Sequence, residues 1–181
     1  MVTAYQPELW RDLYVMLGTS SAALLGLLYV VTSLHLDEII SNPVYRMRAR
    51  TNSIFLVIML VEAALILMPQ PIAQLGIELT VLNLFGWSFP VRNSYRYFFM
   101  HRELSKRGGM TVSRAAIFHG DFLLGIGGGG CLIGGSNWGM YLITASYVAL
   151  LASVSMNAWS IMLGVGQDEK PVKERPKRHA R

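Results

Sequence analysis

Residues 52–91 read NSIFLVIMLVEAALILM-PQP-IAQLGIELTVLNLFGWSFPV, which is two apolar blocks joined by Pro69-Gln70-Pro71. Each block approaches the ~17–25 residues with which an α-helix, rising ~1.5 Å per residue, crosses ~30 Å of hydrocarbon. One acid, Glu62, does not prevent insertion, because the Leu, Ile, Val and Phe residues of its block outweigh a penalty of roughly 2.5–3.5 kcal/mol. The short link makes the two blocks a tight antiparallel hairpin.

Three further blocks of this kind flank the hairpin, and Gly134–Asn137 makes a second tight hairpin of the last two. The composition agrees, since 52% of the residues are hydrophobic and 15% are charged, against about 25% charged in ordinary soluble domains. We therefore predict an all-α polytopic membrane protein with a membrane domain over residues 14–164. Its five transmembrane helices are expected at about residues 14–36, 52–68, 72–91, 115–135 and 138–164.

Basic residues predict the orientation of the five helices. Of the 16 Lys and Arg residues, all but Arg11 fall in the loops 37–51 and 92–114 or in the basic tail 165–181. Five spans place these segments on one side, and the positive-inside rule makes that side cytoplasmic. The N-terminus, with an interfacial tail over residues 1–13, is then outside and the C-terminus inside. That tail lacks a basic n-region, so no cleavable signal peptide is expected.

The basic segments are expected to contact anionic lipids of the inner leaflet. Residues 92–114 interleave arginines with aromatic residues, and their place after a span favours an amphipathic helix on the membrane over a nucleic-acid site. No nucleic-acid partner is predicted.

Small residues recur at a spacing typical of close helix contacts in lipid, where backbones approach through Gly, Ala and Ser. The predicted packing residues are Gly18, Ala22 and Gly26 in the first span, Gly125 and Gly128 in the fourth, and Ala145, Ala149 and Ser153 in the fifth. The glycine run of the fourth span has a second interpretation, a broken helix that lines a cavity. The stripes fit a homo-oligomer or another membrane protein as partner.

Polar groups at membrane depth form the candidate intramembrane site: Glu62, Glu78, Asp121 and Asn157. Such groups are costly in lipid and are functional candidates by default. Glu62 lies six residues before the end of its span, and Glu78 lies six residues after the start of the next. The two acids are therefore expected at equal depth, where facing carboxylates would share a proton. Alternatively, each acid is protonated or hydrogen-bonded separately from the other. Asp121 and Asn157 are expected at similar depth near the inner side and are candidate partners.

Catalytic, metal and cofactor sites are not predicted. His119 and Asp121 are two residues apart, about 200° around a helix, so they do not share a metal. The hydroxyls of residues 19–21 have no histidine at their depth to act as a base. We therefore expect a protein that is not an enzyme and that has no cofactor.

The segment GTSSAALLGLLYV, residues 18–30, and Asn157-Ala158-Trp159 resemble the first and last spans of a family of small, uncharacterised bacterial multi-span inner-membrane proteins. Some members of this family are labelled modulator of the FtsH membrane protease. The resemblance implies a location in the bacterial inner membrane and carries no catalytic assignment.

Two functional classes follow from these observations. The favoured one is a non-enzymatic scaffold or regulator of a membrane complex, which acts through helix–helix contacts. The alternative is an oligomeric ion or proton channel or transporter that uses Glu62 and Glu78.

Overall fold

The computed structural model describes residues 8–95 and 112–168, which are helical apart from short links. In chain order the helices are α1 (Glu8–Leu34), α2 (Leu36–Ser41), α3 (Pro43–Leu67), α4 (Ile72–Tyr95), α6 (Val112–Ile133) and α7 (Trp138–Asp168). All but α2 are long and apolar enough to cross a membrane. The prediction of an all-α protein with five transmembrane helices is therefore confirmed.

The helices extend beyond the apolar blocks at several ends. The first begins at Glu8, and α3 begins at Pro43, so the arginines of residues 46–50 lie on a helix and not in a loop. Proline suits this first helical position, since its missing N–H has no partner there in any helix. The carbonyl of Asn42 accepts the first helical hydrogen bond, from the Arg46 amide at 3.1 Å. Hydropathy thus located the lipid-spanning part of each helix and missed its polar extensions.

Residues 134–137 link α6 to α7 through a helix end that needs glycine. The amide of Ser136 donates to the carbonyl of Cys131 at 2.9 Å, and the amide of Gly135 donates to that of Leu132 at 2.9 Å. This is the Schellman pattern, in which the residue after the cap is left-handed. Gly135 has φ of +76°, which a glycine adopts at little cost. The chain therefore reverses at once and sends α7 back along α6.

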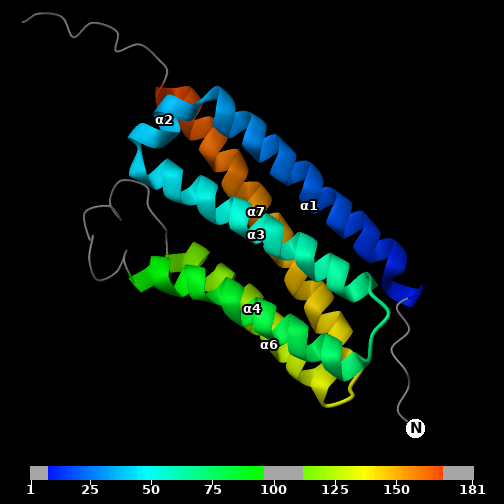
Figure 1. Ribbon diagram of the computed structural model, residues 1–181. Coiled ribbons are helices and arrows are strands. Elements are labelled where there is room, and N and C mark those ends of the chain that lie inside the picture. The colour runs from blue at the N-terminus through cyan, green and yellow to red at the C-terminus, as the bar shows by residue number, and fades with distance from the viewer. Residues whose placement is uncertain (1–7, 96–111, 169–181) are drawn as a thin grey trace, which may run out of the picture.

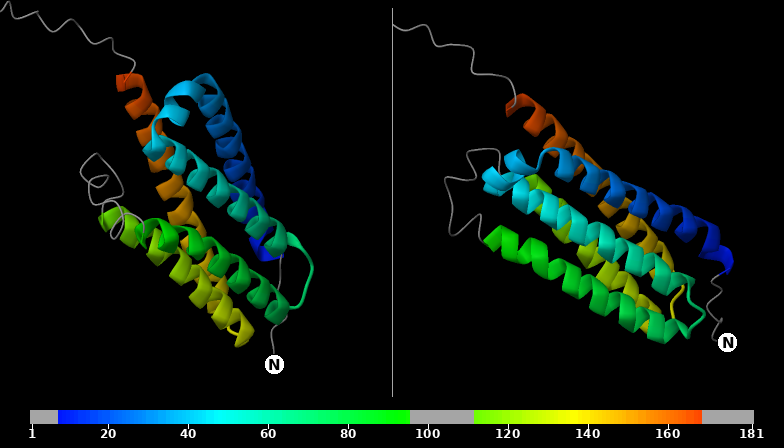
Figure 2. Two further views of the ribbon diagram at one scale, coloured as in Figure 1. Left: turned by 60° about the vertical axis from the view of Figure 1, so that its left-hand side comes forward. Right: turned by 45° about the horizontal axis from the view of Figure 1, so that its top comes forward.

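By the extent of their contacts, the five long helices fall into two groups, and α7 runs from the end of α6 toward α2 (Figures 1 and 2). The α1–α3 pair packs along its length, while α4 packs mainly on α6, and α6 on α7. The short link at residues 68–71 joins α3 to α4, yet each of these helices has its most extensive contact elsewhere. We call the two parts the α1–α3 pair and the α4–α6–α7 group.

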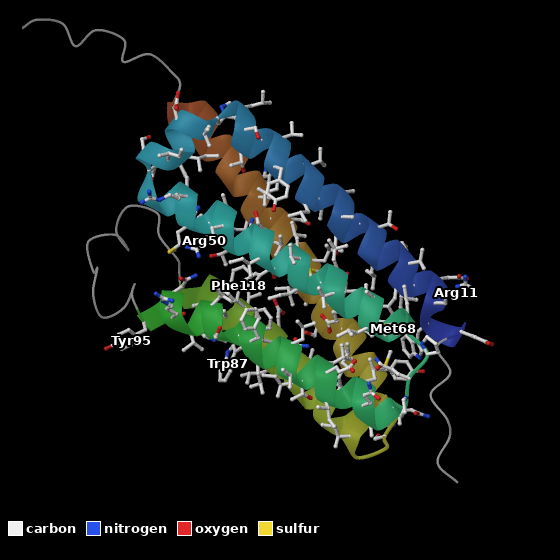
Figure 3. The ribbon with its side chains drawn as sticks, viewed as in Figure 1. Arg11, Arg50, Met68, Trp87, Tyr95 and Phe118 are labelled. Carbon is white, nitrogen blue, oxygen red and sulfur yellow. The ribbon has the colours of Figure 1, made fainter. Side chains whose placement is uncertain are left out.

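Large apolar side chains from both groups form one core. Phe55 of α3 contacts Phe118 and Phe122 of α6 at ring-centroid distances of 5.5 and 5.2 Å, and Phe118 points into the space between α3 and α4 (Figure 3). Many other large apolar residues, such as Leu27 and Val81, are exposed on the outer faces. An exposed apolar surface of this extent suits contact with lipid.

The ends of the molecule differ in charge. Arg11 lies at the same end as Met68 of the α3–α4 link, while Arg50 and Tyr95 lie at the opposite end (Figure 3). Arg46, Arg48 and Arg92 belong to the helix segments at that opposite end. Residues 1–7, 96–111 and 169–181 lie outside the described residues, so the predicted amphipathic helix after the third span and most of the basic tail lie there as well.

Candidate functional site

Glu62 is the most deeply buried acid of the described residues. Its side chain is 2% exposed, as is that of Asn83 on α4. The amide Nδ2 of Asn83 donates to Oε1 of Glu62 at 3.5 Å and to the carbonyl of Leu79 at 2.9 Å. A side chain at Gly125 of α6 would collide with the Asn83 amide. The glycine therefore makes the space in which Asn83 reaches Glu62.

Tyr147 of α7 brings a hydroxyl group to the same level of the bundle. Its hydroxyl donates to the carbonyl of Met59 at 3.1 Å and shares a 3.0 Å hydrogen bond with Ser21 of α1. Met59 and Glu62 are three residues apart on α3 and so share a helix face. Tyr147 therefore bonds to the face of α3 that carries Glu62. All five long helices thus contribute a residue to one buried cluster, which we call the central polar cluster: Ser21, Met59, Glu62, Asn83, Gly125 and Tyr147.

Glu78 lies apart from this cluster. Gln74 donates to its Oε1 at 3.0 Å from one turn away on α4, and its Oε2 is buried without a hydrogen-bond partner among the described residues. Glu78 and Asn83 are five residues apart, about 140° around the helix, so Glu78 does not face Glu62 when Asn83 does. The structure does not bring the two acids together, and each carboxyl group has its own amide donor.

Asp121 and Asn157 are likewise not partners. Oδ2 of Asp121 accepts from Ser153 at 3.4 Å, and its backbone carbonyl accepts from Ser146 at 2.6 Å. The amide of Asn157 donates instead to Oδ1 of Asn52 at 2.7 Å. Asn52 in turn donates to the carbonyl of Val154 at 3.4 Å. On α7, Ser146 and Ser153 therefore bond to α6, whereas Asn157 bonds to α3.

His119 joins α6 to α4 and does not share a face with Asp121, as the spacing predicts. The indole N–H of Trp87 donates to its Nδ1 at 2.8 Å, and its Nε2 is 3.1 Å from the hydroxyl of Ser94. Because an indole only donates, Nδ1 is the accepting nitrogen, and the neutral ring carries its proton on Nε2. The ring is held by two neighbours on α4, which fits a structural role at this helix contact.

The small residues divide into buried and outward-facing ones. A side chain at Gly125 or Gly128 would strike Asn83 or α7, and one at Gly18 would contact Ala63 of α3 at 3.2 Å. These three glycines are helix contacts, as predicted. Gly26 and Ala22 do not pack within the bundle, because an added Cβ at Gly26 meets nothing within 4 Å and Ala22 is exposed on the same face.

On α7 the predicted stripe lies to one side of the real contact face. Ala145 is exposed, while Ala149 and Ser153 are half-buried. The fully buried face of α7 is formed by their neighbours Ser146, Tyr147, Leu150 and Val154. A spacing of four residues shows that these small residues share one face of the helix. It does not show which of two adjacent faces packs against the neighbouring helices.

Sequence reasoning missed Ser21, Asn52, Asn83, Trp87 and Tyr147. Uncharged amides and hydroxyls carry most of the interhelical hydrogen bonds, whereas the site predicted from the sequence consists mainly of acids. A usable signal was present, since Asn52 and Asn83 are amides within apolar spans, where a polar group needs a partner. The residues 8–95 and 112–168 contain no group of three or more His, Cys, Asp and Glu side chains placed to hold a metal.

Comparison of the chain with protein-family models, with curated proteins and with solved structures finds no match.

Proposed function

We propose that this protein is a non-enzymatic scaffold or regulator of a membrane complex, and that α1 is the helix that contacts its partner. The observation that carries the proposal is the outward face of α1. Ala22 and Gly26, one turn apart, present small residues away from the bundle. Water drives no helix association within lipid, so an exposed small-residue face is where another transmembrane helix approaches most closely.

The position of α1 supports this role. Within the apolar stretch of α1, only 17% of the residues are buried in the bundle, against 44% for the corresponding stretch of α3. Its inward face is used by Tyr14, Leu17, Ser21 and Leu28, which leaves the opposite face to lipid or to a partner. The partner is another membrane protein or a second copy of this chain.

The cellular setting is part of the same proposal. The resemblance of the first and last spans to bacterial inner-membrane proteins supports that membrane as the location. The arginines at the α2–α3 end support an orientation with this end in the cytoplasm, next to anionic lipids. The N-terminus is then outside and the C-terminus inside.

The test is the substitution Gly26→Leu, with Gly127→Leu as its matched control. Gly127 of α6 also faces open space, so both variants should fold with unchanged helix content and elution volume. We expect in-membrane crosslinking to capture a complex with the native chain and with Gly127→Leu, and at least tenfold less complex with Gly26→Leu. Equal yields of the complex from all three chains would refute α1 as the contact helix.

A channel or transporter is the second candidate, and the burial of Glu62 favours it, since an ionisable group in the interior of a membrane bundle is costly. Its predicted form with a Glu62–Glu78 pair loses support from the separate partners of the two acids. Proton and ion flux in liposomes decides this candidate: it requires flux from the native chain that Glu62→Gln abolishes. Well-folded native protein that carries no flux under several gradients counts against it.

A further inference from the structure

The contacts within each group of helices differ in kind from the contacts between the two groups. Within the α4–α6–α7 group, backbones approach closely at glycines: a Cβ at Gly76 would strike the carbonyl of Gly129, and one at Gly128 would strike that of Gly139. Within the α1–α3 pair, Gly18 meets Ala63. Such close contacts permit little rearrangement, so each group is expected to behave as a rigid unit.

Apolar side chains such as Phe55, Phe118 and Phe122 pack between the two groups, and a set of hydrogen bonds also links the groups. These hydrogen bonds join Tyr14 to Thr144, Ser21 and Met59 to Tyr147, Asn52 to Val154 and Asn157, Thr51 to Asn93, and Glu62 to Asn83. We call this set the polar interface. Hydrogen bonds between helices in a membrane average well under 2 kcal/mol each. Side-chain contacts of this kind can exchange between arrangements more readily than the close backbone contacts at glycines within the α4–α6–α7 group.

Glu62 is the only acid whose side chain takes part in the polar interface within the described residues, and its surroundings are poor in positive charge. Its one hydrogen bond comes from an amide at the long distance of 3.5 Å. One turn away on α3, the Met59 carbonyl accepts from the uncharged hydroxyl of Tyr147, which also shares a hydrogen bond with Ser21 of α1. The other acids and the histidine of α4 and α6 have partners of their own, Gln74 for Glu78, Ser153 for Asp121, and Trp87 and Ser94 for His119.

A carboxylate in such a place needs a compensating positive charge, because an unpaired charge in a low-dielectric interior is strongly unfavourable. We propose that Glu62 binds one small monovalent cation, H⁺ or Na⁺, and that occupancy of this site sets how the α1–α3 pair packs on the α4–α6–α7 group. The filled site is neutral and the interface stays closed. Emptying it leaves a charge that draws in water and separates the groups. The site is independent of the scaffold role, and it operates whether or not the cation crosses the membrane.

The experiment measures the distance between the two groups in the full-length chain. Spin labels are placed at Leu34→Cys on α1 and Leu123→Cys on α6, two positions 74% and 50% exposed, in a Cys131→Ser background. Pulsed electron spin resonance in lipid nanodiscs then compares alkaline choline buffer, acidic choline buffer and alkaline Na⁺ buffer. We expect a longer or broader distance distribution in alkaline choline. Recovery in acid alone identifies H⁺ as the ligand, and recovery with Na⁺ at constant pH identifies Na⁺.

Two variants show whether the change in distance depends on Glu62 or on another titratable group. Glu62→Gln keeps the size and hydrogen-bonding capacity of a neutral Glu62, and it should hold the closed distances in all three buffers. Glu78→Gln removes an acid outside the polar interface and should respond like the native chain. Identical distances for the native chain in every buffer overturn the proposal, as does a response that persists in Glu62→Gln. Where Glu62→Gln does not fold, infrared difference spectra of the native chain decide, because absence of any carboxyl change between the buffers also overturns it.

Discussion

At the scale of single residues, polar side chains in this bundle act as connectors between helices. The sequence identified Glu62, Asp121 and Asn157 as groups that need a partner, and the structure gives each one a partner. The sequence did not identify the partners, because these are neutral groups on other helices, such as Asn52, Asn83 and Ser153. A hydrogen bond between two spans depends on the rotation of both helices, which apolar blocks with weak periodicity leave undetermined.

The Asn52–Asn157 hydrogen bond joins the two groups of helices at 2.7 Å. We expect Asn52→Ala and Asn157→Ala each to destabilise the protein, and the double variant to lose less than the sum of the two. The coupling free energy should be about 0.6–1.7 kcal/mol, the range found for hydrogen bonds between transmembrane helices. Unfolding of the four chains by denaturing detergent in mixed micelles measures it. Strictly additive losses would show that the amides do not interact in the folded protein.

At the scale of helices, glycine positions decide which neighbours approach most closely. The run of glycines at 127–130 belongs to one continuous helix, α6, so the interpretation as a broken helix is not supported. Within the run, Gly128 faces α7 and Gly129 faces α4, while Gly127 and Gly130 face open space. A helix of ~3.6 residues per turn directs successive residues about 100° apart. Two adjacent glycines therefore serve two different neighbours.

Gly129 and Gly130 form a matched pair for testing this contact. In Gly129→Ala the new methyl group strikes Thr80 and the Gly76 backbone, whereas in Gly130→Ala it meets nothing within 4 Å. We expect Gly129→Ala to lower the free energy of unfolding by about 1–3 kcal/mol, the usual effect of overpacking. Gly130→Ala should be neutral or slightly stabilising, since alanine favours helices over glycine. Detergent unfolding distinguishes the two, and equal losses would contradict the assigned α4–α6 contact.

At the scale of the whole molecule, hydropathy and loop lengths predicted the number of spanning helices and both short links. They did not predict how the helices group, since the α3–α4 link brings two helices together at one end only. Contacts along the full length of the helices decide which helices pack together. These contacts depend on where small and large residues face each other. The outward position of Gly26 illustrates this, because a small residue is equally compatible with an inner contact and with an outer face.

Topology is the property of the whole chain that labelling tests directly. Gln70 lies in the α3–α4 link and Asp37 lies on α2, at opposite ends of the bundle. Single cysteines at these positions, in a Cys131→Ser background, should react with an impermeant maleimide from opposite sides of the membrane. Because the arginines lie at the α2 end, we expect Gln70→Cys to react in right-side-out vesicles and Asp37→Cys only in inverted ones. Labelling of both from one side would contradict the five-span fold, while reversed sides would keep the fold and overturn the orientation.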